Sequence, residues 1–349
     1  MSEALLVVKN LKKYFPINTN FMGKATHFVR AVDDVSFTVA KGKTLGIVGE
    51  SGCGKTTMGR SILRLHEITA GQIIYNGIDI GKLTRKELRE IRPKLQIIFQ
   101  DPFSSLSPRL NVGEIIGEAV KEHGIVPRHE YKDYILKIMR DCGLQPHYFE
   151  RYPHEFSGGQ RQRICIARAL ALDPELVICD EPVSALDVSI QAQIINLLKE
   201  LQQQFQLTYI FISHDLSVVE HISDEVAVMY LGSIVEMGPK KEIFSKRLHP
   251  YTDALFSAIP LPDPKIKMKR VILEGDIPSP ANPPSGCKFH TRCPKAMEVC
   301  KTVPPRTITA GEGHTVVCHL YDKEIMKNPQ EALKKAQAEQ QSAQTEAWQ

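Results

Sequence analysis

A glycine-rich segment at residues 49–56 (G-E-S-G-C-G-K-T) has the residue types and spacing of a phosphate-binding loop. An apolar strand at residues 43–48 precedes it, and a helix over residues 57–65 can follow it. In that context the glycines let backbone N–H groups converge on phosphate oxygens at the positive end of the helix. We therefore predict that Lys55 reaches the β- and γ-phosphates of ATP and that the Thr56 hydroxyl holds Mg²⁺. The rest of the predicted cradle is Ser51, Gly52, Cys53, Gly54 and Thr57.

Two acids, Asp180 and Glu181, end an apolar run at residues 176–179. A carboxylate at the end of a strand can bind the metal ion through water, and we assign this role to Asp180. Glu181 follows it, placed to polarise the attacking water as a general base. Many strands end in acids, so this pattern is weak alone, but an earlier phosphate-binding loop makes it strong.

The segment F-S-G-G-Q at residues 156–160 can form a second anion-binding nest, because a serine and two glycines open a helix there. The chain already has one phosphate-binding loop, so this nest would serve a nucleotide bound to another subunit. We therefore expect a head-to-tail pair of ATPase domains with two nucleotides at the interface. The predicted contacts are Ser157, Gly158, Gly159 and Gln160.

Three further polar residues complete this set. Gln100 follows a strand at residues 95–99 and can sense the γ-phosphate, and we predict it as a ligand of Mg²⁺ together with Thr56 and Asp180. His214 follows a strand at residues 209–212 and can contact the γ-phosphate and orient the catalytic pair that it forms with Glu181. Asp187, in S-A-L-D, can link the opposite sites. Each alone is more often a capped turn or a solvated residue, but their order along the chain favours a shared function.

Strand-like runs alternate with helical stretches along the chain, and this pattern predicts an α/β core with a partly parallel sheet to position these residues. A helix-rich segment at about 101–171 reads as an inserted subdomain, with helical spacing at residues 131–139 and 161–170. We expect one domain over residues 1–247, a proline-rich and poorly packed extension over 248–323, and a polar tail over 324–349 without an assigned function. The expected strands are residues 4–8, 31–39, 45–48, 72–75, 95–99, 176–179, 209–212 and 225–229.

Composition limits the class of protein. The chain has 349 residues and a net charge of +4, which is too small for a protein that coats nucleic acid. No apolar run approaches the roughly 20 residues needed to span a bilayer, and the first residues do not form a signal peptide. We therefore expect a cytoplasmic location, with any link to a membrane made through a partner.

Four of the eight cysteines lie close together in the extension, with spacing C-x5-C-x6-C-x17-C. In a reducing cytoplasm such a cluster suggests a metal site before disulfides. Structural zinc sites usually have more closely spaced cysteine pairs, so a zinc site is a less favoured alternative that stays open. Unligated thiols are a further alternative. His290, His314 and His319 could replace a cysteine, although we expect them at the surface. The cysteines are Cys287, Cys293, Cys300 and Cys318.

Together, these motifs resemble the ATP-binding subunit of an ABC transporter over residues 4–247. The resemblance implies a P-loop NTPase fold of the ABC type, with a helical subdomain and, here, a small cysteine-containing extension. It also implies an aromatic side chain near the N-terminus that stacks on adenine. We assign this role to Phe15, with Tyr14 as the alternative, next to an apparent insertion at residues 16–27.

The extension resembles that of ATPase subunits of bacterial oligopeptide and dipeptide importers. The resemblance rests on L-H-P-Y-T (248–252), S-A-I-P (257–260), G-D-I-P-S-P (275–280) and P-S-G-C-K-F (284–289). It implies two permeases, an extracytoplasmic peptide-binding protein and a second ATPase, either a paralogue or another copy of this chain. H-E-F-S-G-G-Q-R-Q-R (154–163) is closer to the second, F-type, ATPase subunit. The resemblance of the extension also implies that the four cysteines bind a [4Fe–4S] cluster.

Two other functions remain open from the residues. An importer of this type could carry nickel or another small solute, because absent partners select the cargo. A soluble ABC ATPase acting on ribosomes or DNA is less favoured. Ribosome-acting members usually carry two cassettes, and repair members carry a long coiled-coil or zinc insertion that this chain lacks.

Overall fold

The computed structural model describes residues 3–19, 25–258, 271–329, 331 and 333. Its internal contacts divide the chain into two compact units. The first unit contains Met1–Leu11, Ser36–Ile47 and Thr56–Asp224, and the second contains Lys12–Val35, Val48–Lys55 and Glu225–Gln349. The domain boundary predicted after residue 247 falls inside the second unit and stays a prediction. The prolines at 260, 262 and 264, the end of S-A-I-P and most of the polar tail lie outside the described residues.

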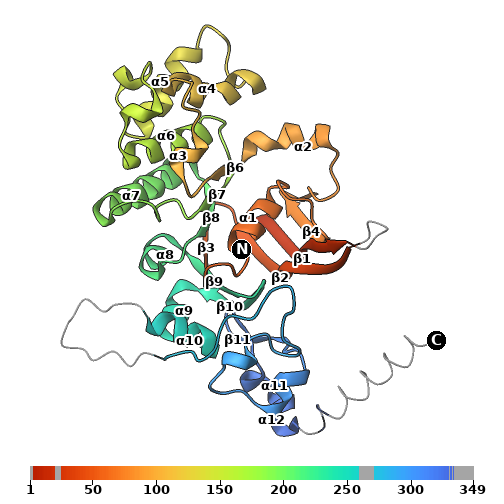
Figure 1. The fold of residues 1–349 in the computed structure, drawn as a ribbon. Coiled ribbons are helices and arrows are strands. Elements are labelled where there is room, and N and C mark those ends of the chain that lie inside the picture. The colour runs from red at the N-terminus through yellow and green to blue at the C-terminus, as the bar shows by residue number, and fades with distance from the viewer. Residues whose placement is uncertain (1–2, 20–24, 259–270, 330, 332, 334–349) are drawn as a thin grey trace, which may run out of the picture. The chain divides into compact units, whose positions relative to one another are not determined.

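The first unit is built around four parallel strands in the order β3-β8-β7-β6 (Figure 1). Every residue of β3, β7 and β8 is buried, as expected for parallel strands covered on both faces. This confirms the α/β class and the apolar runs predicted as strands. The elements are β3 (Thr44–Val48), α1 (Lys55–Ile62), β4 (Ala70–Tyr75), β5 (Ile78–Asp79), α2 (Arg85–Ile91), β6 (Leu95–Ile98), α3 (Pro102–Ser105), α4 (Val112–His123), α5 (Tyr131–Asp141), α6 (Gly158–Leu170), β7 (Leu176–Asp180), α7 (Val188–Phe205), β8 (Thr208–Ile212) and α8 (Leu216–Ile222).

A second sheet has the order β2-β1-β4-β5. β1 (Ala4–Thr19) and β2 (Ala25–Ala40) are much longer than the predicted runs. The segment predicted as an insertion in a loop therefore continues the strands on both sides, apart from residues 20–24, which lie outside the described part.

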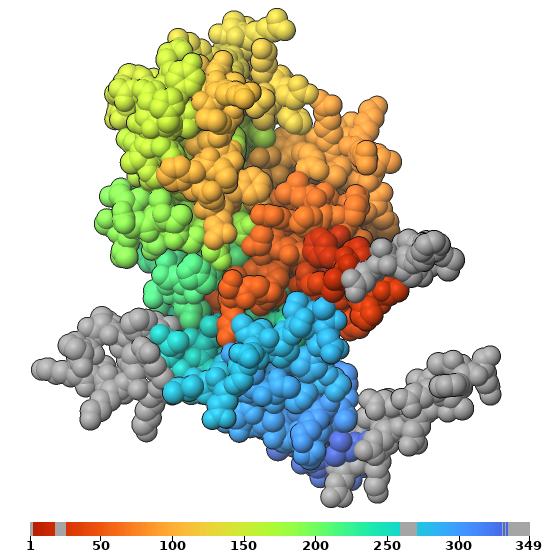
Figure 2. All heavy atoms as spheres, in the orientation of Figure 1, coloured from red at the N-terminus to blue at the C-terminus, as the bar shows by residue number. Residues whose placement is uncertain are grey.

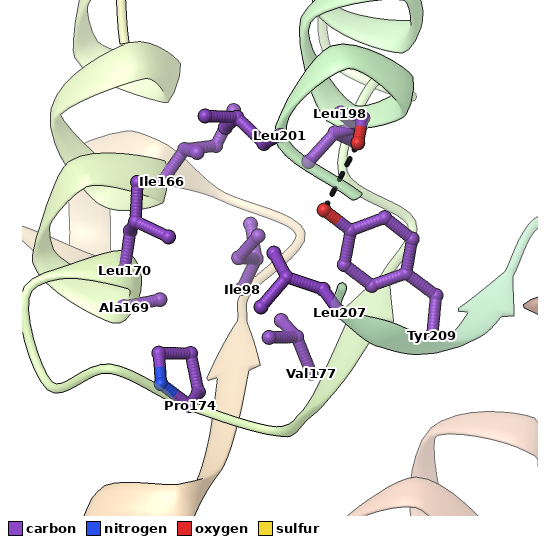
Figure 3. Close-up of a pocket in the computed structure, with 10 residues that line it drawn as sticks. All are labelled: Ile98, Ile166, Ala169, Leu170, Pro174, Val177, Leu198, Leu201, Leu207 and Tyr209. Atoms are coloured by element: carbon purple, nitrogen blue, oxygen red, sulfur yellow. Dashed lines mark hydrogen bonds between the residues drawn. The ribbon is translucent and has the colours of Figure 1, made fainter. Parts of the chain in front are cut away.

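The core of the first unit is closely packed. A void between the sheet and helices α6 and α7 has a volume of only about 10 Å³ and an apolar lining (Figure 3). Tyr209 lies beside it and donates its hydroxyl hydrogen bond to the carbonyl of Leu198 at 3.0 Å. A space of this size has room for about one water molecule, so it cannot be a substrate site.

Helices α3, α4, α5 and α6 form one group, as Figure 1 shows. α4 begins with a capping box between Asn111 and Glu114 and ends at Gly124, whose φ of 61° is left-handed. The helices predicted at residues 131–139 and 161–170 correspond to α5 and α6. The predicted helix-rich segment is therefore present, and α6 leads directly to β7.

The second unit contains an antiparallel set of strands in the order β9-β10-β12-β11. We did not predict β10, β11 or β12, and the expectation of a poorly packed extension was wrong. Phe289, Val299 and Val316 are almost completely buried, and Figure 2 shows the described part of the extension closely packed. The elements are β9 (Glu225–Tyr230), β10 (Ser233–Pro239), α9 (Lys240–Ser245), α10 (Pro250–Ser257), α11 (Glu298–Thr302), β11 (Thr307–Gly311), β12 (His314–Val317) and α12 (Lys323–Lys327).

Within the described ranges, the structure contains no helix with the length and apolar character of a membrane span.

Candidate nucleotide-binding and catalytic site

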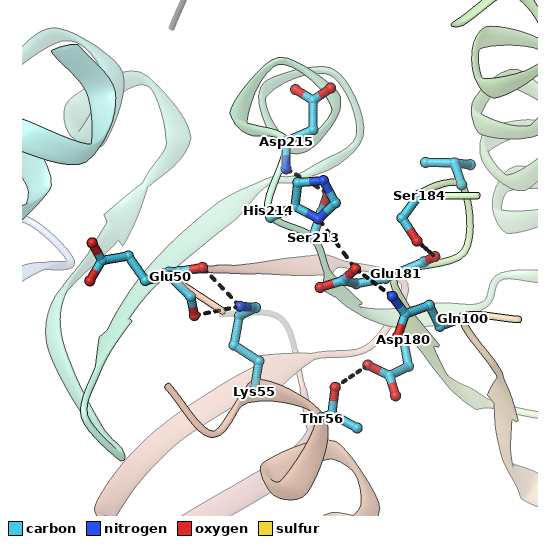
Figure 4. Close-up of polar contacts among 12 residues, drawn as sticks. Glu50, Lys55, Thr56, Gln100, Asp180, Glu181, Ser184, Ser213, His214 and Asp215 are labelled. Carbon is cyan, nitrogen blue, oxygen red and sulfur yellow. Dashed lines mark hydrogen bonds and ion pairs between the residues drawn. The ribbon is translucent and has the colours of Figure 1, made fainter. Parts of the chain in front are cut away.

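Three predicted site residues lie together at one edge of the parallel sheet. Gln100, Glu181 and His214 follow β6, β7 and β8, and the carboxyl ends of parallel strands share an edge. The side chains of Gln100 and His214 both contact the same carboxylate oxygen, Oε2 of Glu181 (Figure 4). Gln100 Nε2 donates to it at 3.0 Å, and His214 Nδ1 lies 3.2 Å from it.

The backbone of Glu181 has an unusual conformation. Its φ of 50° lies in the left-handed region, which costs a non-glycine residue roughly 1–3 kcal/mol. The Glu181 N–H donates to the Ile212 carbonyl at 3.0 Å, and the Ser184 hydroxyl donates to the Glu181 carbonyl at 3.1 Å. These bonds hold the turn after β7 so that the carboxylate faces Gln100 and His214.

His214 lies in a fixed loop between β8 and α8. The N–H of Asp215 donates to the Ser213 hydroxyl at 3.0 Å, and the Asp215 carboxylate accepts from the N–H groups of Ser217 and Val218 as the cap of α8. The helix start therefore limits how far His214 can move.

Asp180, the last residue of β7, is only 1% exposed. Its carboxylate accepts the Thr56 hydroxyl hydrogen bond at 2.8 Å and lies 3.9 Å from the Arg60 guanidinium. The structure thus brings together the two oxygen ligands predicted for Mg²⁺, Thr56 and Asp180. Gln100, the third predicted ligand, contacts Glu181 instead. Thr57 lies in the first turn of α1, where its carbonyl accepts from Ser61.

The phosphate-binding loop lies in the second unit up to Lys55. Lys55 is 5% exposed, and its Nζ donates to the carbonyls of Gly49 and Glu50 at 2.8 and 3.1 Å (Figure 4). Gly54 has a φ of 106°, and a Cβ there would lie 2.0 Å from the Ala31 carbonyl oxygen, so only glycine fits. Between these residues, Ser51 and Gly52 are exposed and Cys53 is buried.

The second predicted nest begins helix α6, as expected. Ser157 is the cap: its N–H donates to Gln160 Oε1 at 3.0 Å, and its hydroxyl accepts from the Gln160 N–H at 3.4 Å. A Cβ at Gly159 would lie 2.5 Å from Ile190, and one at Gly158 would lie 3.3 Å from Leu186. The glycines therefore allow α6 to pack against the residues that flank Asp187.

Asp187 is the residue before α7, and its side chain makes no capping hydrogen bond there. Among the described residues, no hydrogen bond joins Ser157 or Gln160 to Glu181. The structure thus gathers Gln100, Glu181 and His214 in one cluster, and it places Asp187 beside the nest in another part of the first unit.

A family model described as "ABC transporter" matches residues 32–184, and one described as "Oligopeptide/dipeptide transporter, C-terminal region" matches residues 235–300. The "Oligopeptide transport ATP-binding protein AppF" of Bacillus subtilis is 53% identical over 322 residues, which cover 91% of this chain and 98% of that protein. The chain belongs to the ABC transporter family, in its oligopeptide/dipeptide branch.

Other relatives agree with this assignment. A "Probable peptide ABC transporter ATP-binding protein" of Sinorhizobium fredii is 52% identical and covers 92% of this chain and 91% of its own. Among solved structures, the ATP-binding cassette MJ0796 bound to ADP and Pi has a TM-score of 0.60 and 27% identity, covering 67% of this chain and 98% of its own. CbiO1 from Clostridium perfringens has a TM-score of 0.61 and 26% identity, covering 70% of this chain and 92% of its own. The resemblance to ABC transporter ATPases is therefore confirmed.

The two candidates for the adenine-stacking residue of this ABC protein are neighbours in β1. The Tyr14 hydroxyl donates to Asp33, and its pKa is raised to about 12 by burial and by that carboxylate. The guanidinium of Arg30 lies over the Tyr14 ring, and Lys13 Nζ lies 4.6 Å from the centre of the Phe15 ring. Both rings therefore have a cation over one face, and the assignment to Phe15, with Tyr14 as the alternative, stays a prediction.

The four cysteines of the extension are free thiols, with Cys287 and Cys300 buried and Cys293 and Cys318 half-buried. Burial raises the pKa of Cys287 to about 12, with contributions from Cys300, Cys318 and Cys293. The Cys287 N–H donates to the Cys300 carbonyl at 2.8 Å. However, among the described residues no three His, Cys, Asp or Glu side chains are grouped to hold a metal ion. The structure therefore does not support the predicted iron–sulfur cluster.

The expectation that the nearby histidines lie at the surface was wrong for two of them. His314 and His319 are each 2% exposed. His314 Nε2 lies 2.8 Å from the buried Glu236 carboxylate, and His319 Nε2 lies 2.9 Å from the Val303 carbonyl. His290 is half-buried, with Nδ1 2.8 Å from the Cys287 carbonyl. These partners give each histidine a structural role.

Proposed function

We propose that this chain is the ATP-hydrolysing subunit that powers import of di- or oligopeptides through a membrane permease complex. The observation that carries the proposal is the cluster of Gln100, Glu181 and His214 at the sheet edge, in a chain whose extension matches the oligopeptide/dipeptide transporter region. The relatives named as peptide transport proteins support peptides as cargo over nickel.

The proposed chemistry follows from the side chains in hand. The loop before α1 binds the phosphates, where Lys55 exchanges its two carbonyl partners for phosphate oxygens. Thr56 and Asp180 would hold Mg²⁺, which would supply positive charge to neutralise the phosphates. Glu181 accepts the proton of the attacking water, and Gln100 and His214 orient its carboxylate.

We assign the nest at Ser157 to a second ATPase subunit's nucleotide. The helix cap formed by Ser157 and Gln160 presents backbone N–H groups at the start of α6, where an anion is favourable. MJ0796, which has a similar fold, forms a dimer bound to ADP and Pi, and this supports a two-ATPase arrangement. The complete proposed assembly adds a paralogous or identical ATPase, two permeases and, indirectly, an extracytoplasmic peptide-binding protein. It places this chain at the cytoplasmic face of the membrane, as a peripheral subunit.

A tagged pull-down from detergent-solubilised membranes of the native host tests the assembly. We expect two multi-span permeases and one further ATPase, and an untagged strain provides the control. Recovery of ribosomal or DNA-repair proteins without a membrane protein would refute the transport function and leave the ATPase chemistry intact. A nickel-binding protein encoded with the recovered permeases would change the cargo alone.

We also propose that Cys287, Cys293, Cys300 and Cys318 hold a [4Fe–4S] cluster that staples the extension. The support is the donor set alone, because four free thiols in one short segment are the ligands that a [4Fe–4S] cluster needs. Gly286 lets the loops that hold Cys287 and Cys300 approach closely. Its φ is 64°, and a Cβ there would lie 2.4 Å from the Cys300 carbonyl oxygen, so only glycine fits. Such a cluster would supply a covalent tie and take no part in hydrolysis.

Anaerobic purification is expected to yield brown protein with about four iron and four sulfide per chain. Cys293→Ser should lose iron and colour, because three thiolates then remain. Cys165→Ala, which changes a buried cysteine in α6, is the matched control and should keep both. Colourless wild-type protein with stoichiometric zinc, or with no metal, would exclude the cluster.

A further inference from the structure

Glu50, the second residue of the phosphate-binding loop, is held on two sides by the extension. Its carboxylate accepts two hydrogen bonds from Arg292, whose two terminal nitrogens lie 2.8 and 3.0 Å from the two oxygens. Its N–H donates to the Tyr251 hydroxyl at 2.9 Å. Neither Arg292 nor Tyr251 was predicted as a functional residue. The sequence signal is slight: Arg292 directly precedes Cys293, and Glu50 lies inside the glycine-rich motif.

This ion pair is well shielded from water. The Arg292 side chain is 8% exposed and the Glu50 side chain 25%. The guanidinium lies 5.9 Å from the centre of the Tyr230 ring, and Tyr230 packs against Tyr251 and Phe289 with ring centres 4.7 and 5.2 Å away. Bidentate, shielded pairs fix geometry far better than exposed surface pairs.

The Glu50 residue is directly connected to the lysine that would meet ATP. Its carbonyl accepts from Lys55 Nζ at 3.1 Å and from the Cys53 N–H at 3.3 Å. The side chain and N–H of Glu50 are fixed by the extension, and its carbonyl orients Lys55. A change in the Glu50 backbone would therefore move the phosphate-binding groups.

A second charged side chain from the same segment, Lys288, contacts β2 and β10. Lys288 Nζ donates to Asp33 at 2.8 Å and to the Ser233 hydroxyl at 2.6 Å. Asp33 in turn accepts from Tyr14, next to Phe15. Lys288 and Arg292 both lie between Cys287 and Cys293, in a short stretch that ends in a 3₁₀ helix at His290–Arg292.

We propose that Arg292 is a positioning residue for ATP binding: through Glu50 it holds the phosphate-binding loop in its binding conformation. The extension thereby sets nucleotide affinity in addition to any role in assembly. The inference rests on the proposed role of residues 49–56 in binding ATP. Arg292 touches neither Glu181 nor Asp180 by any hydrogen bond within the described residues, so it acts on binding rather than on the chemical step.

The test compares Arg292→Gln, Arg292→Lys and Arg306→Gln in the full chain, by equilibrium binding of a fluorescent ATP analogue and by steady-state hydrolysis. We expect Arg292→Gln to raise the Kd and KM for ATP about tenfold with less than a twofold change in kcat. Arg292→Lys should recover part of the affinity, because an ammonium supplies charge without the bidentate fork. Arg306, in the same extension, pairs with Asp322 and Glu324 and is 56% exposed, so its variant should match wild type.

Glu50→Gln breaks the same ion pair from the other side. It keeps the inference testable if Arg292→Gln proves too unstable to measure. If the two side chains act as a pair, Glu50→Gln raises Kd similarly and the double variant raises it no further. Additive effects, or a wild-type Kd in Arg292→Gln, would overturn the inference. Lys55→Ala in the same assay separates the two proposals: if it binds ATP normally, the role of the loop itself is wrong.

Discussion

Glu181→Gln is expected to bind ATP with wild-type affinity and to hydrolyse it at least about a hundredfold more slowly. The size of the effect is that of losing a general base. Glutamine has almost the same shape as glutamate but cannot accept the proton of the attacking water. The chain should then remain with ATP bound, and an ATP-dependent dimer should accumulate because hydrolysis no longer reopens it.

The geometry makes this variant informative. The Gln100 amide can still donate to the side-chain oxygen of a glutamine, and the bonds at the Glu181 N–H and carbonyl come from the backbone. The left-handed turn after β7 should therefore be retained. A loss of rate would then report on proton transfer and not on a displaced loop.

The measurements are kcat for ATP hydrolysis, equilibrium binding of ATP, and size-exclusion chromatography with and without ATP. Glu200→Gln, an exposed acid near the end of α7, is the matched control and should behave as wild type. Turnover of Glu181→Gln at the wild-type rate would show that another group accepts the proton. His214, 3.2 Å from the same carboxylate oxygen, would be the next candidate.

The catalytic edge of the sheet could be predicted from sequence because its signals are local. Strands β6, β7 and β8 are short apolar runs, and each is followed within two residues by the polar side chain of interest. Since parallel strands bring their carboxyl ends to one edge, the order of motifs was enough to place Gln100, Glu181 and His214 together. Local sequence patterns and one rule of sheet topology were therefore sufficient to predict this part of the site.

β10 could not be predicted in this way because its buried face contains an acid. Glu236 is 1% exposed and accepts hydrogen bonds from the N–H groups of Leu248 and His249, while His314 Nε2 lies 2.8 Å from it. These partners remove the cost of burying the carboxylate, but they come from other parts of the chain. The same long-range pairing explains why His314 is buried and why β12 beside β10 was missed.

The link between Arg292 and Glu50 shows the same limit. The two residues are separated by 242 positions, and nothing in their immediate neighbours indicates a partner. Sequence motifs identify residues that act on ligands through their own local geometry. Residues that act by holding a motif in place become visible only when the fold brings them into contact.

Lys55→Ala is expected to weaken ATP binding at least about tenfold and, as a consequence, to abolish hydrolysis at cellular ATP concentrations. The lysine supplies one positive charge directly to the β- and γ-phosphates, and a charge-assisted hydrogen bond of this kind is worth more than a neutral one. Lys55 Nζ donates to the carbonyls of Gly49 and Glu50, so the loop itself fixes the position of the ammonium group.

Lys43→Ala is the matched control for this prediction. Lys43 lies just before β3, and its Nζ forms a surface ion pair with Asp224 at 3.0 Å, so its loss should change neither Kd nor kcat. Unchanged ATP affinity in Lys55→Ala would remove residues 49–56 from the binding site, and with them the proposed function. The two variants should fail in opposite ways: Lys55→Ala should lose ATP and the ATP-dependent dimer, whereas Glu181→Gln should keep both. That contrast would assign binding to the loop before α1 and proton transfer to the end of β7, because a general loss of stability would impair both steps in both variants.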